Sequence, residues 1–317
     1  MRLLLPAAAL ASLPMLLSGQ ATKAWQAPRT ADGQPDLQGV WSAATITPVE
    51  RPQDLAGKAF FTPEEARAYE KDWRTRNNMD RRDGPTESDV GRAYNDFWWD
   101  RGTQVVRTLR TSLVIDPADG RIPALTPQAS ARQAERTAQR RASSAVNGPE
   151  DRPLAERCIL FGGGGVPITP TAYNNNYQIV QSRDSVAIVA EMIHDVRVIP
   201  LDGRAHVPSS VRLWKGDSIG HWEGDTLVVE TTNFMPDTAF RGSSQYMRLV
   251  ERFSRTAEDT LLYQYTVTDA ESFAQPWTVE IPMWPAEGRI YEYACHEGNE
   301  GMVGILKAAR AAEKVAP

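Results

Sequence analysis

The fold is decided by three consecutive stretches: MRLVERFSRT (247–256), AED (257–259) and TLLYQYTVTD (260–269). The first and third are rich in β-branched and aromatic residues, and a short polar segment separates them. Two such runs joined by a short polar connection indicate two antiparallel strands and their turn. We therefore expect a β-hairpin here, and the neighbouring sequence repeats the same signal in both directions.

The repeated signals predict a mainly β protein. Successive hairpins favour an antiparallel meander that closes as a barrel and so removes its exposed edges, with a β-sandwich as the alternative. Thr62 followed by Pro63 marks the start of a helix over 63–76, and Thr126-Pro127 starts another that ends near residue 142. A short helix over 303–312 would complete two or three peripheral helices. The other expected strand pairs are 111–115 with 121–125, 177–181 with 185–200, 207–214 with 226–234, and 278–284 with 289–295.

The first residues resemble an export signal. Arg2 precedes an apolar stretch from Leu3 to Leu17, which is shorter than the roughly 20 residues that a membrane span needs. Cleavage is expected after Ala24, with Ala21 as the alternative, and no cysteine near these sites forms a lipoprotein signal. The remaining 25–317 would form a single β-rich domain with an N-terminal loop and helix region over 25–110. We expect a periplasmic or secreted protein with no membrane span.

Charge and cysteine content narrow the function further. The net charge of −5 is mild and argues against a general nucleic-acid binder, which carries a basic face. In an oxidising compartment, two cysteines suggest one bridge, so Cys158 and Cys295 are predicted to form a disulfide. No cofactor is indicated. The four histidines have none of the short metal-binding spacings, so no metal site is predicted.

The most informative stretch for chemistry is VAIVAEMIHDVRVI, residues 186–199. Read as one strand, it places Glu191, Asp195 and Arg197 on one face and His194 on the other. Ionisable groups on so apolar a strand are costly to bury without partners. They indicate either a catalytic cluster inside a barrel or a structural salt bridge.

Three further sets of residues could carry function. WKGDSIGHWEGD (214–225) holds His221 and Glu223 among tryptophans, which suits a site for sugars or flat aromatic ligands but also fits a packed turn. CHEGN (295–299) would place a histidine and a glutamate beside the disulfide. Arg157 precedes a glycine-rich loop, 162–165, and an asparagine run at 174–176 could contact a polyol. The residues predicted to bind ligand are Trp214, Trp222, Asn176 and Arg157.

Several strings look like those of known groups. DGQPDLQGVW (32–41), the segment 214–234 and YACHEGN (293–299) resemble a large family of uncharacterised exported bacterial β-rich proteins. That resemblance implies secretion and a β-rich fold, and it implies no activity. Gly39-Val40-Trp41 also resembles the Gly-x-Trp of the first lipocalin strand, which agrees with a lipocalin- or calycin-like barrel.

Two functions follow as hypotheses. The leading one is an extracytoplasmic enzyme, a lyase, isomerase or hydrolase, that uses acid–base chemistry on a small carbohydrate, phenolic or terpenoid-like ligand. Glu191 or Asp195 would be the base, Arg197 the anion stabiliser, and a histidine the acid. The alternative is a non-catalytic, lipocalin-like binding or carrier protein, and the oligomeric state stays open. The catalytic groups would come from Glu191, His194, Asp195, Arg197, His221, Glu223, His296 and Glu297.

Overall fold

The computed structural model describes residues 25–82, 95–142, 146–161, 165–238 and 240–315. The expected signal peptide and most of the glycine loop lie outside these residues. Within them the chain is mainly β. The strands are β1 (Gly39–Ser42), β2 (Val114–Asp116), β3 (Asn176–Gln181), β4 (Ser185–Ala190), β5 (Asp195–Pro200), β6 (Asp217–Glu223), β7 (Thr226–Thr232), β8 (Arg248–Ala257), β9 (Thr260–Thr268) and β10 (Trp277–Pro285).

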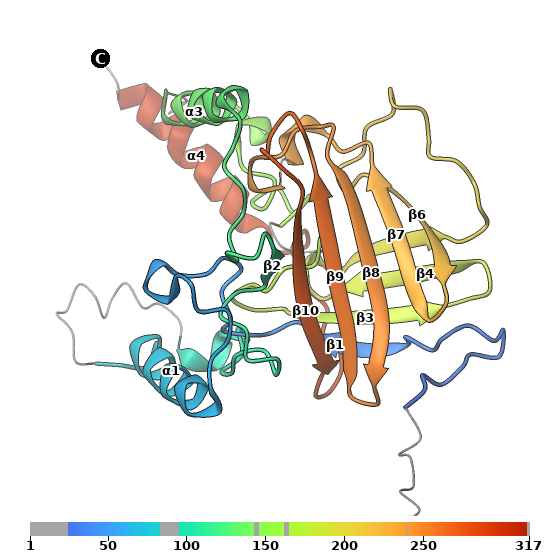
Figure 1. Ribbon diagram of the computed structural model, residues 1–317. Coiled ribbons are helices and arrows are strands. Elements are labelled where there is room, and N and C mark those ends of the chain that lie inside the picture. Colours follow the sequence, from blue (N-terminus) through green and yellow to red (C-terminus); the bar gives the residue numbers. More distant parts are fainter. Residues whose placement is uncertain (1–24, 83–94, 143–145, 162–164, 239, 316–317) are drawn as a thin grey trace, which may run out of the picture.

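These strands form one antiparallel sheet in the order β5-β4-β3-β1-β10-β9-β8-β7-β6, and β2 pairs with β10. The sheet curls into a nearly closed barrel (Figure 1). The two edge strands of the sheet, β5 and β6, lie close together. A Cβ atom added to Gly220 of β6 would lie 2.9 Å from the side chain of Ile199 and from that of Leu201. Lys215 also bridges this seam, where its ammonium group binds the Asp195 carboxylate and the carbonyl oxygen of Val196. The predicted mainly β barrel is confirmed.

Several expected strand pairs are correct and others are wrong. The hairpins β8–β9 and β3–β4 form as expected. The segment 207–214, which the sequence predicts to pair with 226–234, is irregular, and β6 pairs with β7 in its place. The segment 289–295, which the sequence predicts to pair with 278–284, forms no strand, and β10 pairs with β9 and β1 instead. Strand β2 likewise pairs with β10, and 121–125 forms no strand. The simple meander is interrupted because β1 inserts between β3 and β10.

The expected long strand over 185–200 is a second correction. It breaks into β4 and β5 at a tight turn, so that Ala190 pairs with Asp195. Ile193 and His194 have positive φ angles of 59° and 43° there, a conformation that strands do not contain. The break places Glu191 in the turn, and within β5 only Arg197 and Ile199 are buried.

The interior of the barrel is filled by large side chains. Tyr263 and Tyr265 of β9 and Trp277 of β10 are fully buried, and each such side chain stabilises the fold by roughly 1.5–3 kcal/mol. One opening is also filled by the buried segment 165–169. Its Ile168 backbone N–H donates to the Tyr263 hydroxyl at 3.1 Å. The interior is thus a packed core that incorporates this segment.

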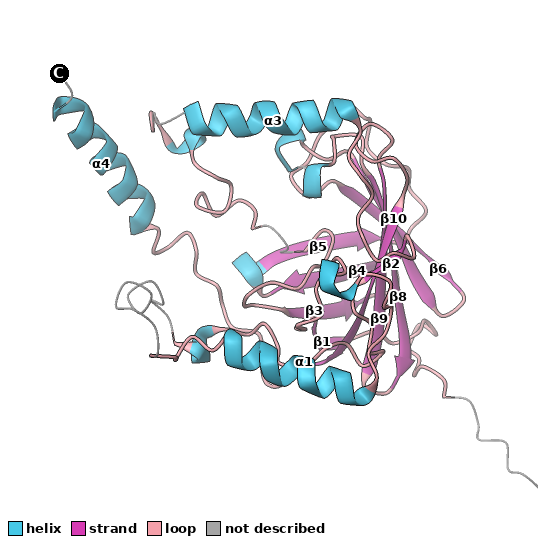
Figure 2. Cartoon of the chain, turned by 60° about the vertical axis from the view of Figure 1, so that its left-hand side comes forward, coloured by secondary structure: helices cyan, strands magenta, loops and turns pink. Residues whose placement is uncertain are grey.

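Three helices lie around the barrel: α1 (Pro63–Arg76), α3 (Pro127–Ala142) and α4 (Glu300–Val315) (Figure 2). All three lie where the sequence predicts a helix. The start of α1 is fixed by a capping box, in which Thr62 accepts from the Glu65 N–H at 3.2 Å and Glu65 accepts from the Thr62 N–H at 2.8 Å. None of the described helices is long and apolar enough to cross a membrane.

Candidate functional site at the end of the barrel

The buried charges of the barrel form a closed network. Arg197 makes a bidentate ion pair with Glu251 of β8, and the Tyr263 hydroxyl donates to the same carboxylate at 2.8 Å. Burial raises the pKa of the Tyr263 hydroxyl well above its usual range, so this tyrosine remains a donor. The Arg197 guanidinium therefore neutralises a carboxylate that the sequence did not single out.

Glu191 lies in the turn that follows β4, at the end of the barrel. Its side chain accepts a hydrogen bond from the Asn176 amide at 2.9 Å. Burial raises the pKa of the Glu191 carboxyl, and the nearby Asp100 carboxylate raises it further. Such a group holds its proton more readily than an exposed glutamate, as general acids and bases do.

The same turn is tied to the segment that follows β10. Nδ1 of His194 lies 2.7 Å from the carbonyl oxygen of Tyr293, so the imidazole carries its proton on Nδ1 and donates to this acceptor. Two residues later Cys295 forms the predicted disulfide with Cys158, with 5.8 Å between their Cα atoms. The turn after β4 is therefore hydrogen-bonded to the segment that follows β10, and the disulfide cross-links that segment to Cys158.

The other predicted catalytic residues lie elsewhere. Asp195 binds Lys215 at the barrel seam. His221 and Glu223 are exposed on the outer wall, where Nε2 of the imidazole lies 3.2 Å from the carboxylate and Arg252 pairs with the same glutamate at 2.9 Å. The structure does not bring these residues, or Arg197, together with Glu191 and His194.

The residues near the disulfide differ in exposure. His296 and Glu297 are exposed in the turn that follows Cys295, whereas Arg157 is half-buried one residue before Cys158. Of the two predicted tryptophans, Trp222 packs against the barrel core and Trp214 is half-buried in the loop before β6. Only Asn176 among the predicted ligand-binding residues contacts Glu191.

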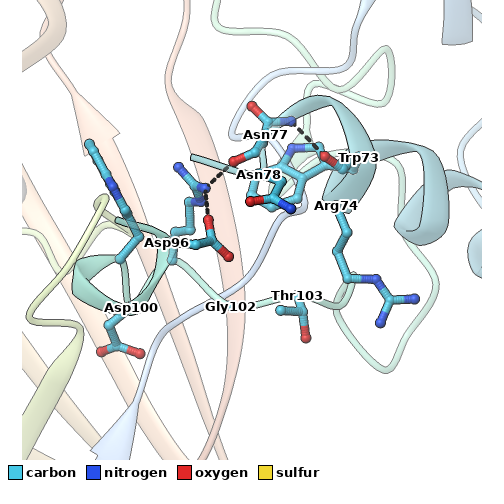
Figure 3. Close-up of a pocket in the computed structure, with 10 residues that line it drawn as sticks. Trp73, Arg74, Asn77, Asn78, Asp96, Asp100, Gly102 and Thr103 are labelled. Atoms are coloured by element: carbon cyan, nitrogen blue, oxygen red, sulfur yellow. Dashed lines mark hydrogen bonds and ion pairs between the residues drawn. The ribbon is translucent and has the colours of Figure 1, made fainter. Parts of the chain in front are cut away.

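A cavity of about 330 Å³ lies between the C-terminal end of α1 and the loop at 96–103 (Figure 3). Its central feature is Arg101, whose guanidinium lies 5.1 Å from the ring centre of Trp73 and 4.9 Å from that of Trp99. Arg101 also pairs with Asp96 at 3.0 Å. The cavity is lined by Trp73, Arg74, Asn77, Asn78, Asp96, Trp99, Asp100, Arg101, Gly102 and Thr103.

Asp100 connects this cavity with the Glu191 turn. This residue lines the cavity, its carboxylate raises the pKa of Glu191, and its backbone carbonyl accepts a hydrogen bond from the Asn175 amide at 2.5 Å. Partial burial raises the pKa of the Asp100 carboxyl as well. The cavity and the Glu191 turn are therefore two parts of one candidate site at the barrel end.

Sequence reasoning missed the residues that line the cavity. They follow a polar stretch that reads as a loop, and their aromatic and charged side chains meet only when 96–103 folds against α1. The FWW run at 97–99 is the one local signal, because three consecutive aromatic residues are unusual in so polar a segment. A second missed contact joins His206 to Asp217, whose side-chain atoms Nδ1 and Oδ2 lie 2.7 Å apart. Among the described residues, no three histidine, cysteine or acidic side chains form a group that could hold a metal ion.

No model of a protein family matches the chain, and no curated protein matches it. Among solved structures, the chain is similar to a mutant of the fluorescent protein UnaG, with 16% identity and a TM-score of 0.23. The match covers 42% of this chain and 86% of that one.

Proposed function

We propose that this protein binds a small molecule at the end of its barrel, in the cavity around Trp73, Trp99 and Arg101. The observation that carries the proposal is the lining of this cavity, which combines two indole rings with amide, carboxylate and guanidinium groups. A concave site with aromatic walls and a few polar groups is the usual form of a small-ligand site, and about 330 Å³ falls at the small end of the range for such sites.

The packing of the barrel supports this position for the ligand. A carrier of the lipocalin type would hold its ligand inside the barrel. Here Trp277, Tyr263 and Tyr265 occupy that space, and the segment 165–169 fills one opening. A ligand in the interior would have to displace a packed core, whereas a ligand in the cavity would not.

The polar groups of the cavity indicate the class of ligand. Asn78 lines the cavity, and its amide N–H can donate to a ligand oxygen. The Asp100 carboxylate can accept from a ligand hydroxyl, and an indole face can stack on a sugar or phenol ring. We infer a small hydroxylated ring compound, either a carbohydrate or a phenol, in preference to an apolar terpenoid.

The test is a binding titration with methyl glycosides and simple phenols, followed by calorimetry on the wild type and two variants. Trp73→Ala removes one wall of the cavity and is expected to weaken binding about tenfold or more. Trp98→Ala is the matched control, because Trp98 is 63% exposed and does not line the cavity. Equal losses in both variants, or no binding of any compound by the wild type, would overturn the proposal.

A second candidate function is acid–base catalysis by Glu191. The favouring observation is its buried carboxyl group, whose raised pKa brings it closer to the pH at which a general base works. Glu191→Gln should then abolish turnover of a bound compound while leaving its affinity at the cavity within about twofold. Unchanged turnover in this variant would remove the enzyme hypothesis and leave the binding protein.

The disulfide supports a location outside the reducing cytoplasm, because such bridges persist in oxidising compartments. We infer a periplasmic or secreted protein. Cell fractionation with a thiol titration of the unreduced protein tests this: the expected result is an extracytoplasmic protein without titratable thiols. Two free thiols in freshly isolated material would contradict it.

A further inference from the structure

The segment between β10 and α4, residues 286–299, runs without regular secondary structure over the end of the barrel; we call it the C-terminal strap. It starts at Ala286, whose N–H donates to the Val40 carbonyl of β1 at 2.9 Å. It ends at Asn299, whose amide donates to the Glu156 carbonyl at 2.8 Å. Between these points it touches the candidate site.

Two contacts fix the middle of the strap. Its Tyr293 carbonyl accepts from the His194 imidazole, three residues after the buried Glu191, and its Cys295 is bonded to Cys158. The hydrogen bond lies on a surface that water reaches, since the imidazole is exposed. The disulfide is the one covalent contact among them.

The residues that receive the strap have constrained backbones. Cys158 has a φ of 56°, and Ile193 and His194 have φ values of 59° and 43°. Residues other than glycine seldom adopt such angles, and they keep them only where surrounding contacts hold them there. The strap supplies contacts at two of these three positions, so its release would let both turns relax.

We propose that the Cys158–Cys295 disulfide is a redox latch that holds the C-terminal strap over Glu191 and thereby controls access to the candidate site. The control of ligand access by this latch rests on the proposed function, whereas the release of the strap on reduction does not. In the latched state the strap is held against the turn that contains the buried Glu191 carboxylate. In the unlatched state, water and ligand hydroxyl groups reach this carboxylate.

The chemistry of release is thiol–disulfide exchange with a dithiol. A thiolate of the reductant attacks Sγ of Cys295, the less buried of the two sulfurs, and Cys158 leaves as a thiolate that takes up a proton. The second thiol of the reductant then resolves the mixed disulfide. Two electrons and two protons pass to the protein, which gains two thiols, and the dithiol becomes a cyclic disulfide.

Hydrogen–deuterium exchange on the purified protein tests the latch, with and without dithiothreitol. We expect peptides that contain the turn 191–194 and the strap residue Cys295 to exchange about tenfold faster after reduction. The backbone N–H groups of His194 and Cys295 donate to the carbonyls of Glu191 and Tyr293, and both hydrogen bonds lie in segments that reduction releases. Peptides from β8 and β9 should exchange at an unchanged rate. The double variant Cys158→Ser/Cys295→Ser should match the reduced wild type, and reduction in place keeps the test valid if that variant folds poorly.

Two results would overturn the latch: protection at 191–194 and Cys295 that reduction leaves unchanged, or faster exchange throughout β8 and β9, which signifies general unfolding. His194→Ala is a further control, because it removes one hydrogen bond and keeps the bridge; its strap should stay protected at 295–299. Exchange needs no ligand, so its outcome is separate from the proposed function. If no methyl glycoside or phenol binds in either redox state, the proposed function fails while the exchange result still decides the latch.

Discussion

The wall of the barrel and its end at Glu191 are built in opposite ways. Buried and more exposed residues alternate along β9 and over 248–254 of β8, and each strand pairs with its neighbour in sequence. At the barrel end the contacts join distant segments: His194 meets Tyr293, and Cys158 meets Cys295, 137 residues away. The wall is organised by local pattern, whereas the end is assembled from long-range contacts that hold strained turns and a buried acid.

This difference assigns separate roles to the two regions. The inward side chains of the wall are packed in the core, and its buried ion pair between Arg197 and Glu251 is internally neutralised. The end instead places indole, amide, carboxylate and guanidinium side chains around an open cavity. Function is therefore expected at the end, with the wall as its support.

The largest effect is expected where the two regions meet, at the ion pair between Arg197 of β5 and Glu251 of β8. Arg197→Met leaves the fully buried Glu251 carboxylate without its partner, and this should lower the free energy of unfolding by about 3–5 kcal/mol. Urea unfolding followed by circular dichroism measures it. The matched control is the double variant Arg197→Met/Glu251→Leu, which removes both charges and should recover most of the loss. A single variant that costs less than about 1 kcal/mol would show that the pair is solvated.

A smaller effect is expected at the seam of the wall. Gly220→Ala places a methyl group 2.9 Å from Ile199 and Leu201, which should push β5 away from β6 and cost about 1–3 kcal/mol. Gly224→Ala is not crowded, but its φ of 59° adds strain of its own, so Ile219→Ala is the better comparison for a change without a clash. Thermal unfolding of these variants tests the seam. A Gly220→Ala protein as stable as the wild type would mean that β5 and β6 are farther apart than described.

The smallest effect is a change in the pH dependence of stability. The raised pKa of Glu191 means that the folded state binds its proton more tightly than the unfolded state does, where the pKa is near 4.5. Its contribution to stability is therefore present below about pH 4.5 and is lost as pH rises through the raised pKa. Glu191→Gln should remove this loss of stability at higher pH. Urea unfolding of both proteins at a series of pH values measures the effect.

Glu223 on the outer wall is the matched control for that experiment. Arg252 and His221 lower the pKa of its carboxyl, so its contribution has the opposite sign: present above about pH 4.5 and lost as pH falls. Glu223→Gln should remove the loss of folding stability that occurs as the pH falls below about 4.5. If both variants changed the pH profile in the same direction, the contrast between wall and end would not hold.

The sequence predicted the wall far better than the end, for a physical reason. The hairpin β8–β9 follows from alternation and a short turn, both of which are local properties of the chain. The end could not be derived this way: the break at 191–194 contacts Tyr293, 99 residues after His194, and β1 inserts between strands that are distant in sequence. Glu191 and Asn176 were chosen for their polarity in apolar or turn-rich sequence and do meet, whereas Trp73, Trp99 and Asp100 carried no local signal strong enough to select them.

The most direct test of the central claim is a nuclear magnetic resonance titration that follows the indole N–H signals of the tryptophans, assigned by Trp→Phe variants. Methyl glycosides and simple phenols would be added to the ¹⁵N-labelled protein. We expect the signals of Trp73 and Trp99 to shift together with ligand concentration, while the signal of the fully buried Trp277 stays fixed. A shift of the Trp277 signal with no change at Trp73 and Trp99 would place the ligand inside the barrel and contradict the account.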